Sequence, residues 1–113
     1  KLYLKLNKKY YGKGVVHDRQ IRYEWARIPH FYNAFYVYKY ATGLTAAVTL
    51  ANSVLSGGEI ERDRYFDKFL RAGGCKSPYE ILRDAGVDLM TERPYETAML
   101  EFRNTLGEFT SIV

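Results

Sequence analysis

Residues 23–55, YEWARIPHFYNAFYVYKYATGLTAAVTLANSVL, decide the fold of this chain. The stretch holds the only tryptophan and a long run with almost no helix-breaking residue. Pro29 fixes its own φ and disfavours the helical conformation for the residue before it, so a helix can begin at or just after Pro29 but does not run through it. We therefore predict one continuous helix from about His30 or Asn33 to Leu55, roughly 35 Å long and mostly buried.

The two halves of this predicted helix differ in composition. Residues 31–40 are dense in aromatic side chains, and a helix would stack Tyr32, Tyr36 and Tyr40 along one face. Buried phenol hydroxyls need hydrogen-bond partners, which makes these tyrosines, beside His30, candidates for function. The second half is typical of helix packing, because small residues recur at spacings that bring another helix close: Gly43, Ala46, Ala47 and Ala51.

Shorter helices are predicted on both sides of the central stretch. Glycine, proline and a serine cap mark the ends of these helices. Four are predicted: a Lys-rich helix over residues 2–11 closed by Gly12, an amphipathic helix from Glu59 to Ala72, a short helix capped at Ser77-Pro78, and a last helix from about Thr91 to Thr110. Five residues of the helix from Glu59 to Ala72 are expected to face inward: Ile60, Tyr65, Phe66, Phe69 and Leu70. No strand signal occurs. The expected class is all-α, a helical bundle around one long central helix, with residues 1–113 as one segment.

Composition sets broad limits on function. The 113 residues are 47% hydrophobic and 27% charged, which is ordinary for a soluble globular domain. The net charge of +4 is concentrated near the amino end, where a solvated helix face is a better interpretation than a nucleic-acid surface. A single cysteine, Cys75, excludes an internal disulfide and fits a reducing compartment, the cytoplasm. We expect no signal peptide, no membrane span and no membrane partner.

No complete active site can be assembled from these residues alone. The sequence has no H-E-x-x-H motif, and its two histidines, His17 and His30, lie too far apart for a metal site with one cysteine. Cys75 precedes a helix start but has no histidine nearby in sequence, so we expect it to be inert. His17 is expected to be an ordinary surface residue. We predict no metal ligand in this chain.

Two long segments carry a resemblance to a known family. Residues 24–57, EWARIPHFYNAFYVYKYATGLTAAVTLANSVLSG, and residues 65–89, YFDKFLRAGGCKSPYEILRDAGVDL, closely resemble the carboxy-terminal part of the oligoendopeptidase F family, among the thimet-oligopeptidase-like zinc metallopeptidases. The resemblance covers about Leu2 to Phe109. It implies a largely helical peptidase that cuts short peptides in a deep channel. It also implies one zinc ion, whose ligands and general base would precede Lys1. On this resemblance the chain would be a carboxy-terminal fragment, and catalysis is expected of the parent protein, not of the isolated chain.

The resemblance also implies roles for residues in the aromatic segment. The family places a His and Tyr side chains over the scissile peptide, where they donate hydrogen bonds to the substrate and to the oxyanion. The matching positions are His30, Tyr32, Tyr36 and Tyr38. The resemblance implies His30, Tyr36 and Tyr38 as catalytic groups, with both of these tyrosines ranked above Tyr32, and it implies His30 and Tyr32 as substrate-binding groups. On an ideal helix Tyr36 and Tyr38 would lie about 200° apart, so one of them would belong to the core.

Two other classes of function remain open on the sequence. The chain could be a stand-alone helical module that holds a peptide or a partner protein in an aromatic groove without cutting it. Alternatively, its basic amino end and its tyrosines could bind single-stranded nucleic acid, a reading we do not favour. Since the short helices offer little cover for the central helix, we also expect the isolated chain to self-associate.

Overall fold

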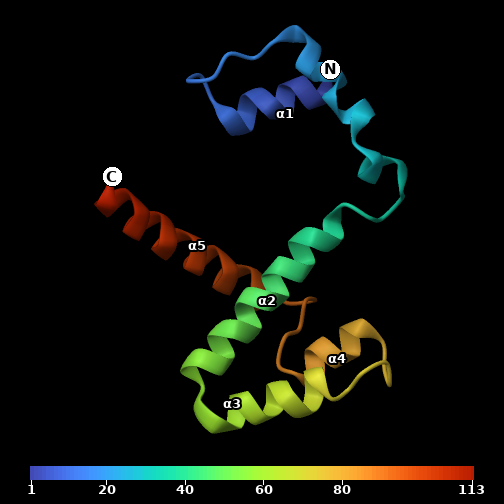
Figure 1. Ribbon diagram of the computed structural model, residues 1–113, viewed down its shortest axis with the longest axis vertical. Coiled ribbons are helices and arrows are strands. Elements are labelled where there is room, and N and C mark those ends of the chain that lie inside the picture. Colours follow the sequence, from blue (N-terminus) through green and yellow to red (C-terminus); the bar gives the residue numbers. More distant parts are fainter. The chain divides into compact units, whose positions relative to one another are not determined.

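Every regular element of the computed structural model, which describes residues 1–113, is a helix (Figure 1). The predicted all-α class is therefore confirmed. The chain divides into two compact units, Lys1–Lys39 and Tyr40–Val113, which we call the amino-terminal unit and the carboxy-terminal unit. None of the helices is both long enough and apolar enough to cross a membrane.

The amino-terminal unit is built from one α-helix and two 3₁₀ segments. They are α1 (Leu2–Tyr11), η1 (Arg19–Arg27) and η2 (Pro29–Tyr32). The predicted helix over residues 2–11 is confirmed, and it ends at Gly12, whose φ of 69° is accessible to glycine without strain. The chain then returns along α1, so that η1 packs against it. No side chain of this unit is fully buried.

The long helix begins later than the sequence predicted. Helix α2 spans Tyr38–Ser56, and residues 33–37 before it are not helical. Asn33 is extended, with φ −106° and ψ 114°, and Phe35 takes a left-handed φ of 58°. A helix cannot continue through these conformations, so the predicted start at His30 or Asn33 is wrong. The predicted stacking of Tyr32, Tyr36 and Tyr40 on one helix face is wrong for the same reason.

The carboxy-terminal unit contains the rest of α2 and four further elements. These are α3 (Gly58–Arg64), the π-helical segment η3 (Tyr65–Leu70), α4 (Pro78–Asp84) and α5 (Arg93–Ile112). The predicted amphipathic helix over residues 59–72 is thus present as α3 continued by η3. The predicted helices at Ser77-Pro78 and towards Thr110 are also present, and α5 extends two residues beyond the predicted end.

The core of this unit is small and lies between α2, η3 and the end of α4. Four buried residues form it: Ala46, Leu50, Ala85 and Val87. Tyr65, Phe69, Leu82 and Leu89 pack around them while remaining partly exposed. The hydroxyl of Thr49 donates to the Pro94 carbonyl oxygen at 3.3 Å and so links α2 to the start of α5.

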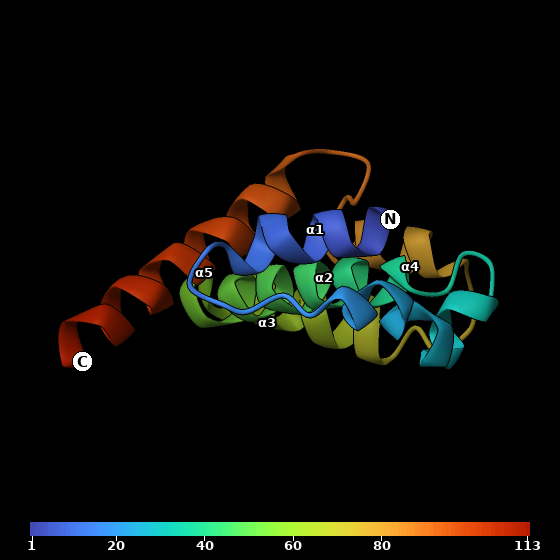
Figure 2. The ribbon, with the colours of Figure 1, turned by 90° about the horizontal axis from the view of Figure 1, so that it is seen from above.

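The expected burial of the long helix is wrong in this structure. Only Ala46, Thr49 and Leu50 of α2 are buried, so the helix is not mostly buried. A second helix of similar length accompanies it, since α5 has 20 residues and α2 has 19. The carboxy-terminal half of α5 extends away from α3 and α4 (Figures 1 and 2). The other helices of the carboxy-terminal unit do not supply enough neighbours to surround α2.

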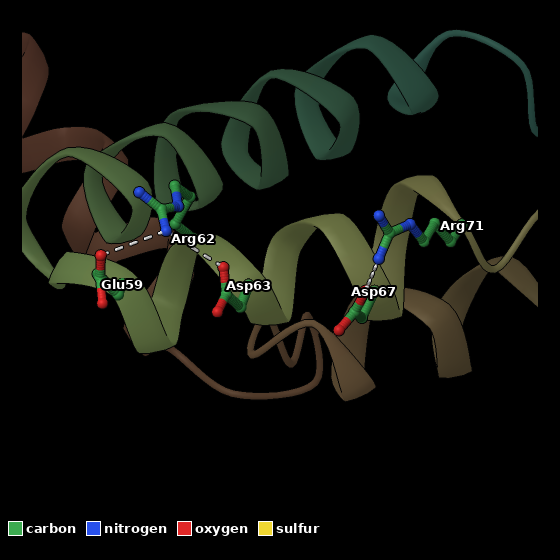
Figure 3. Close-up of polar contacts among 5 residues, drawn as sticks. All are labelled: Glu59, Arg62, Asp63, Asp67 and Arg71. Carbon is green, nitrogen blue, oxygen red and sulfur yellow. Dashed lines mark hydrogen bonds and ion pairs between the residues drawn. The ribbon is translucent and has the colours of Figure 1, made fainter.

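Charged side chains line the outer face of α3 and η3. Arg62 lies 3.6 Å from Glu59 and 3.5 Å from Asp63, and Arg71 pairs with Asp67 one turn away (Figure 3). The Glu59–Arg62 and Asp67–Arg71 pairs have helical spacing, and as exposed pairs they stabilise the segment modestly. The apolar face is less buried than predicted: Tyr65 and Phe69 pack inward, whereas Ile60, Phe66 and Leu70 are 75%, 44% and 52% exposed, so their expected inward position is wrong.

Helix α4 begins with the predicted serine cap. Ser77 Oγ accepts a hydrogen bond from the Glu80 backbone N–H at 3.3 Å, and the Glu80 carboxylate accepts one from the Ser77 backbone N–H at 3.1 Å. This capping box satisfies two backbone donors that the helix itself leaves without partners. Pro78 occupies the first helical position, where its missing N–H costs nothing.

Candidate functional site

The four candidate residues lie within nine positions at the end of the amino-terminal unit. His30 and Tyr32 belong to η2, Tyr36 lies in the non-helical segment that follows, and Tyr38 is the first residue of α2. The geometry that places them is therefore a 3₁₀ turn followed by a bend, not the continuous helix predicted from the sequence.

Local hydrogen bonds hold the turn that carries His30. Ile28 is extended, as expected for the residue before a proline, and its carbonyl oxygen accepts from the Phe31 N–H at 3.2 Å. The hydroxyl of Tyr32 donates to the carbonyl oxygen of Ala26 at 2.6 Å, which ties η2 back to η1. A phenol bound in this way fixes the backbone on either side of Pro29.

The rings of His30 and Tyr36 contact each other. Their centroids are 5.4 Å apart and their planes are inclined by 42°. The ammonium group of Lys39 lies 5.3 Å from the centroid of the Tyr36 ring, within the range of a cation–π interaction. Tyr36 is half-buried, whereas its neighbours in sequence are exposed. Because Tyr36 is not helical, the angle of about 200° that an ideal helix sets between Tyr36 and Tyr38 does not describe this segment.

The other candidate side chains are open to solvent in this chain. His30 is exposed, and Tyr32 and Tyr38 are 66% and 58% exposed. They are not enclosed in a self-sufficient helical core. An imidazole and a phenol are both able to donate a hydrogen bond to a carbonyl oxygen.

An apolar pocket of about 600 Å³ adjoins the His30 turn. Trp25 of η1 and Phe31 of η2 form one side, and α1 forms the other. Sequence reasoning did not single out Trp25 or Phe31 as lining residues, although both belong to the quoted aromatic segment. Lys1 and six residues of α1 complete the pocket: Leu2, Tyr3, Leu6, Asn7, Tyr10 and Tyr11.

His17 has a structural position that the sequence did not suggest. Its Nδ1 lies 2.7 Å from Asn7 Oδ1, and its Nε2 lies 2.8 Å from the Gly12 carbonyl oxygen. The side chain is half-buried and connects the loop after α1 to the helix itself. The expectation of an ordinary surface histidine is therefore wrong.

The residues of this chain do not form a site for a metal ion. No three His, Cys, Asp or Glu side chains lie close enough together to hold one. Cys75 is an exposed free thiol. The side chains of this chain therefore offer no set of ligands for a zinc ion.

Comparison with known proteins gives a consistent assignment. Residues 1–101 match Peptidase family M3. Over 112 residues the chain is 46% identical to Oligopeptidase PepF of Bacillus subtilis and 43% identical to the plasmid Oligoendopeptidase F of Lactococcus lactis subsp. cremoris. It is 39% identical over the same length to Group B oligopeptidase PepB of Streptococcus agalactiae.

These relatives are much longer than the chain described here. The matches cover 99% of this chain but only 17% of the Bacillus subtilis protein and 18% of the other two. No solved structure matches.

Proposed function

Because this chain belongs to peptidase family M3, we propose that it forms part of the substrate site of a peptidase that hydrolyses oligopeptides. The relatives that it matches over nearly its whole length are named oligopeptidases and oligoendopeptidases, which supports a peptide substrate. Since the chain spans less than a fifth of their length, the activity is proposed for a longer protein that contains it. An exposed free thiol supports a reducing compartment, the cytoplasm.

In this proposal His30 and Tyr38 act on the carbonyl group of the scissile peptide. As the carbonyl carbon becomes tetrahedral, its oxygen gains negative charge and accepts hydrogen bonds more strongly than it did in the substrate. Donors aimed at that oxygen therefore stabilise the transition state more than the bound peptide. A phenol donates without carrying a charge, and its ring holds the donor in place. Loss of one such donor costs about 3 kcal/mol, which is roughly a hundredfold in rate.

The observation that carries this assignment is the exposure of His30 and Tyr38 within the aromatic segment. Tyr32 is proposed as a substrate-binding group at the edge of the site, because its hydroxyl already donates to Ala26 and only its ring and oxygen lone pairs remain for a peptide. Tyr36 was predicted as a second catalytic donor, but its half-buried ring fits that role less well than Tyr38.

A zinc ion belongs to the proposed enzyme but not to this chain. The described residues offer no group of ligands for it, so its ligands are proposed to lie in the longer protein, outside these 113 residues. The residues of this chain would bind and orient the peptide.

The experiment uses the full-length peptidase that contains this chain. His30→Ala and Tyr38→Phe should each lower kcat by roughly a hundredfold while bound zinc stays at one ion per molecule. Tyr40→Phe is the matched control, because it removes a phenol hydroxyl of the same helix outside the proposed site. Loss of zinc in the His30 variant would reassign that residue to the metal site. Unchanged kcat in both variants would contradict the proposal.

A peptide- or protein-binding module without catalysis is the second candidate, and one observation favours it. The carboxy-terminal unit has an apolar groove of about 980 Å³ between α2, η3 and α4. Uncovered apolar surface of this kind also supports the proposed self-association of the isolated chain. Size-exclusion chromatography at rising concentration tests that point: a monomer throughout would contradict it. Peptide binding by the isolated chain, with full-length His30 and Tyr38 variants fully active, would favour the binding module.

A further inference from the structure

The conformation around Phe35 needs an explanation. A φ of 58° is uncommon for any residue with a side chain and is strained for a bulky one. Such strain persists only where the surrounding structure requires it. The side chain of Phe35 is 82% exposed, so packing of its own ring does not explain the conformation.

The effect of this bend is seen at the next residue. Tyr36 is separated from His30 by five residues, yet its ring contacts the His30 imidazole at 5.4 Å. Lys39, from the first turn of α2, lies against the Tyr36 ring at 5.3 Å. The bend at Phe35, the contact between the two rings and the cation–π contact together hold the Tyr36 ring beside His30.

We propose that Tyr36 is a positioning residue, whose aromatic ring fixes the orientation of the His30 imidazole and whose hydroxyl is not required for catalysis. This inference rests on the proposed function, because it gives His30 the contact with substrate and Tyr36 an action through His30. It changes the role predicted for Tyr36 from the sequence.

The physical reason is preorganisation. His30 lies on a short, exposed 3₁₀ turn, where an imidazole can rotate about two side-chain bonds. A ring packed at a fixed tilt restricts that rotation before the peptide binds, so less entropy is lost in reaching the reactive geometry. Lys39 restrains the ring from the helical side. A displacement of about 1 Å at a catalytic group can cost roughly a hundredfold in rate, so a contact of this kind has a measurable effect.

Two substitutions at one position separate the ring from the hydroxyl. In the full-length peptidase, Tyr36→Phe keeps the ring and should leave kcat within about threefold of the wild type. Tyr36→Leu removes the ring and should lower kcat by roughly ten- to a hundredfold, with a smaller change in KM. If Tyr36 is instead a hydrogen-bond donor to the oxyanion, both variants lose activity equally, and the proposal is overturned.

A double-mutant test shows whether Tyr36 acts through His30. In a His30→Ala background, Tyr36→Leu should cause no further loss of kcat, because there is no imidazole left to orient. A further loss equal to that seen in the wild type would mean that Tyr36 acts elsewhere, against the proposal. If His30→Ala by itself leaves kcat unchanged, the proposed function fails, which is a different outcome from failure of the positioning role.

A spectroscopic measurement does not depend on activity. In the 113-residue chain, the His30 ring protons should show the ring-current shift of a neighbouring aromatic side chain by NMR. Tyr36→Phe should preserve that shift, and Tyr36→Leu should abolish it while the spectrum of the core residues stays unchanged. His17 is the internal control, because its contacts are with Asn7 and Gly12. Identical His30 spectra in all three proteins would overturn the proposal.

Discussion

The two units of this chain differ in the interactions that stabilise them. The carboxy-terminal unit contains every buried residue of the molecule, including Val87, which is 1% exposed. The amino-terminal unit buries none, and it is held by hydrogen bonds and ring contacts between residues close in sequence. All four candidate site residues lie in the amino-terminal unit. The hydrophobic core and the candidate chemistry therefore occupy different parts of the chain.

This division has a physical basis. A residue that must meet a substrate has to remain accessible, so hydrophobic burial cannot hold it in place. Directional contacts can, because a hydrogen bond or a tilted ring pair fixes an orientation without covering the side chain. The following experiments test the division, beginning with the largest expected effect.

Leu50→Ala should have the largest effect on stability. Leu50 is 6% exposed in the core of the carboxy-terminal unit, and its truncation leaves a cavity, which costs about 3 kcal/mol of the free energy of unfolding. Urea denaturation followed by circular dichroism measures this cost. Leu44→Ala is the matched control, because it lies on the same helix but is 68% exposed, and it should cost less than about 0.5 kcal/mol. Equal effects would mean that the core assigned here is not the source of stability.

Alanine substitutions at two glycines, Gly43 inside α2 and Gly57 just after its end, should change the stability of the chain in opposite directions. At Gly57, an added Cβ would lie 2.6 Å from the Ser53 carbonyl oxygen and 2.7 Å from the Glu61 Cβ, so Gly57→Ala should destabilise the chain by about 1–3 kcal/mol. At Gly43, which is inside α2, a Cβ meets nothing within 4 Å. Gly43→Ala should therefore stabilise the isolated chain by about 0.5–1 kcal/mol. Thermal denaturation of both variants checks the signs, and a loss at both positions contradicts the open surface at Gly43.

Ser77→Ala should weaken the start of α4 by about 1 kcal/mol through loss of the cap. Ser111→Ala, near the end of α5, removes a hydroxyl that only bonds locally to Glu108 and should change stability far less.

The hydrogen bond from the Ser77 side chain, followed by that from its backbone, lowers the pKa of Glu80. Ser77→Ala should therefore raise the Glu80 titration midpoint, as followed by carboxyl ¹³C NMR, and an unchanged midpoint would contradict this cause.

The hydrogen bonds between Ser77 and Glu80 also make the stability of α4 depend on pH. Because the Glu80 pKa is lower in the folded chain than in the unfolded chain, its contribution to stability is fully present above the ordinary pKa of the unfolded chain. That contribution is lost as the pH falls through the folded pKa. The pKa of Asp84, lowered by its hydrogen bond with Lys76, acts in the same direction. Helix α4 should thus lose stability at acid pH.

His17→Ala should have the smallest effect on global stability, below about 1 kcal/mol, because it removes side-chain contacts from a unit without a buried core. Its effect should appear locally, as faster amide hydrogen exchange from Asn7 to Gly14. Val16→Ala is the control, since Val16 is 95% exposed beside it. Unchanged exchange in the His17 variant would show that this side chain does not hold the loop.

Sequence reasoning succeeded where the signal was local. The capping box at Ser77, the stop at Gly12 and the helical class follow from short-range chemistry that the residues carry themselves. It failed at Phe35, because nothing in the residue types near it signals a left-handed bend, and the prediction of a helix from His30 or Asn33 depended on the absence of such a signal. Burial was also misjudged for Ile60 and Leu70, because periodicity shows which residues share a face but not whether a neighbour covers it.

The sequence by itself determined the helical class, most helix ends and the family, because capping, turn chemistry and long motifs are properties of neighbouring residues. Only the tertiary structure decided that Tyr36 turns back onto His30, that His17 bridges Asn7 and Gly12, and that four residues make the core. The core depends on where segments distant in sequence meet, and the two histidine contacts depend on the path of the backbone through a bend or a loop. Local preferences of a few tenths of a kcal/mol per residue do not fix either one.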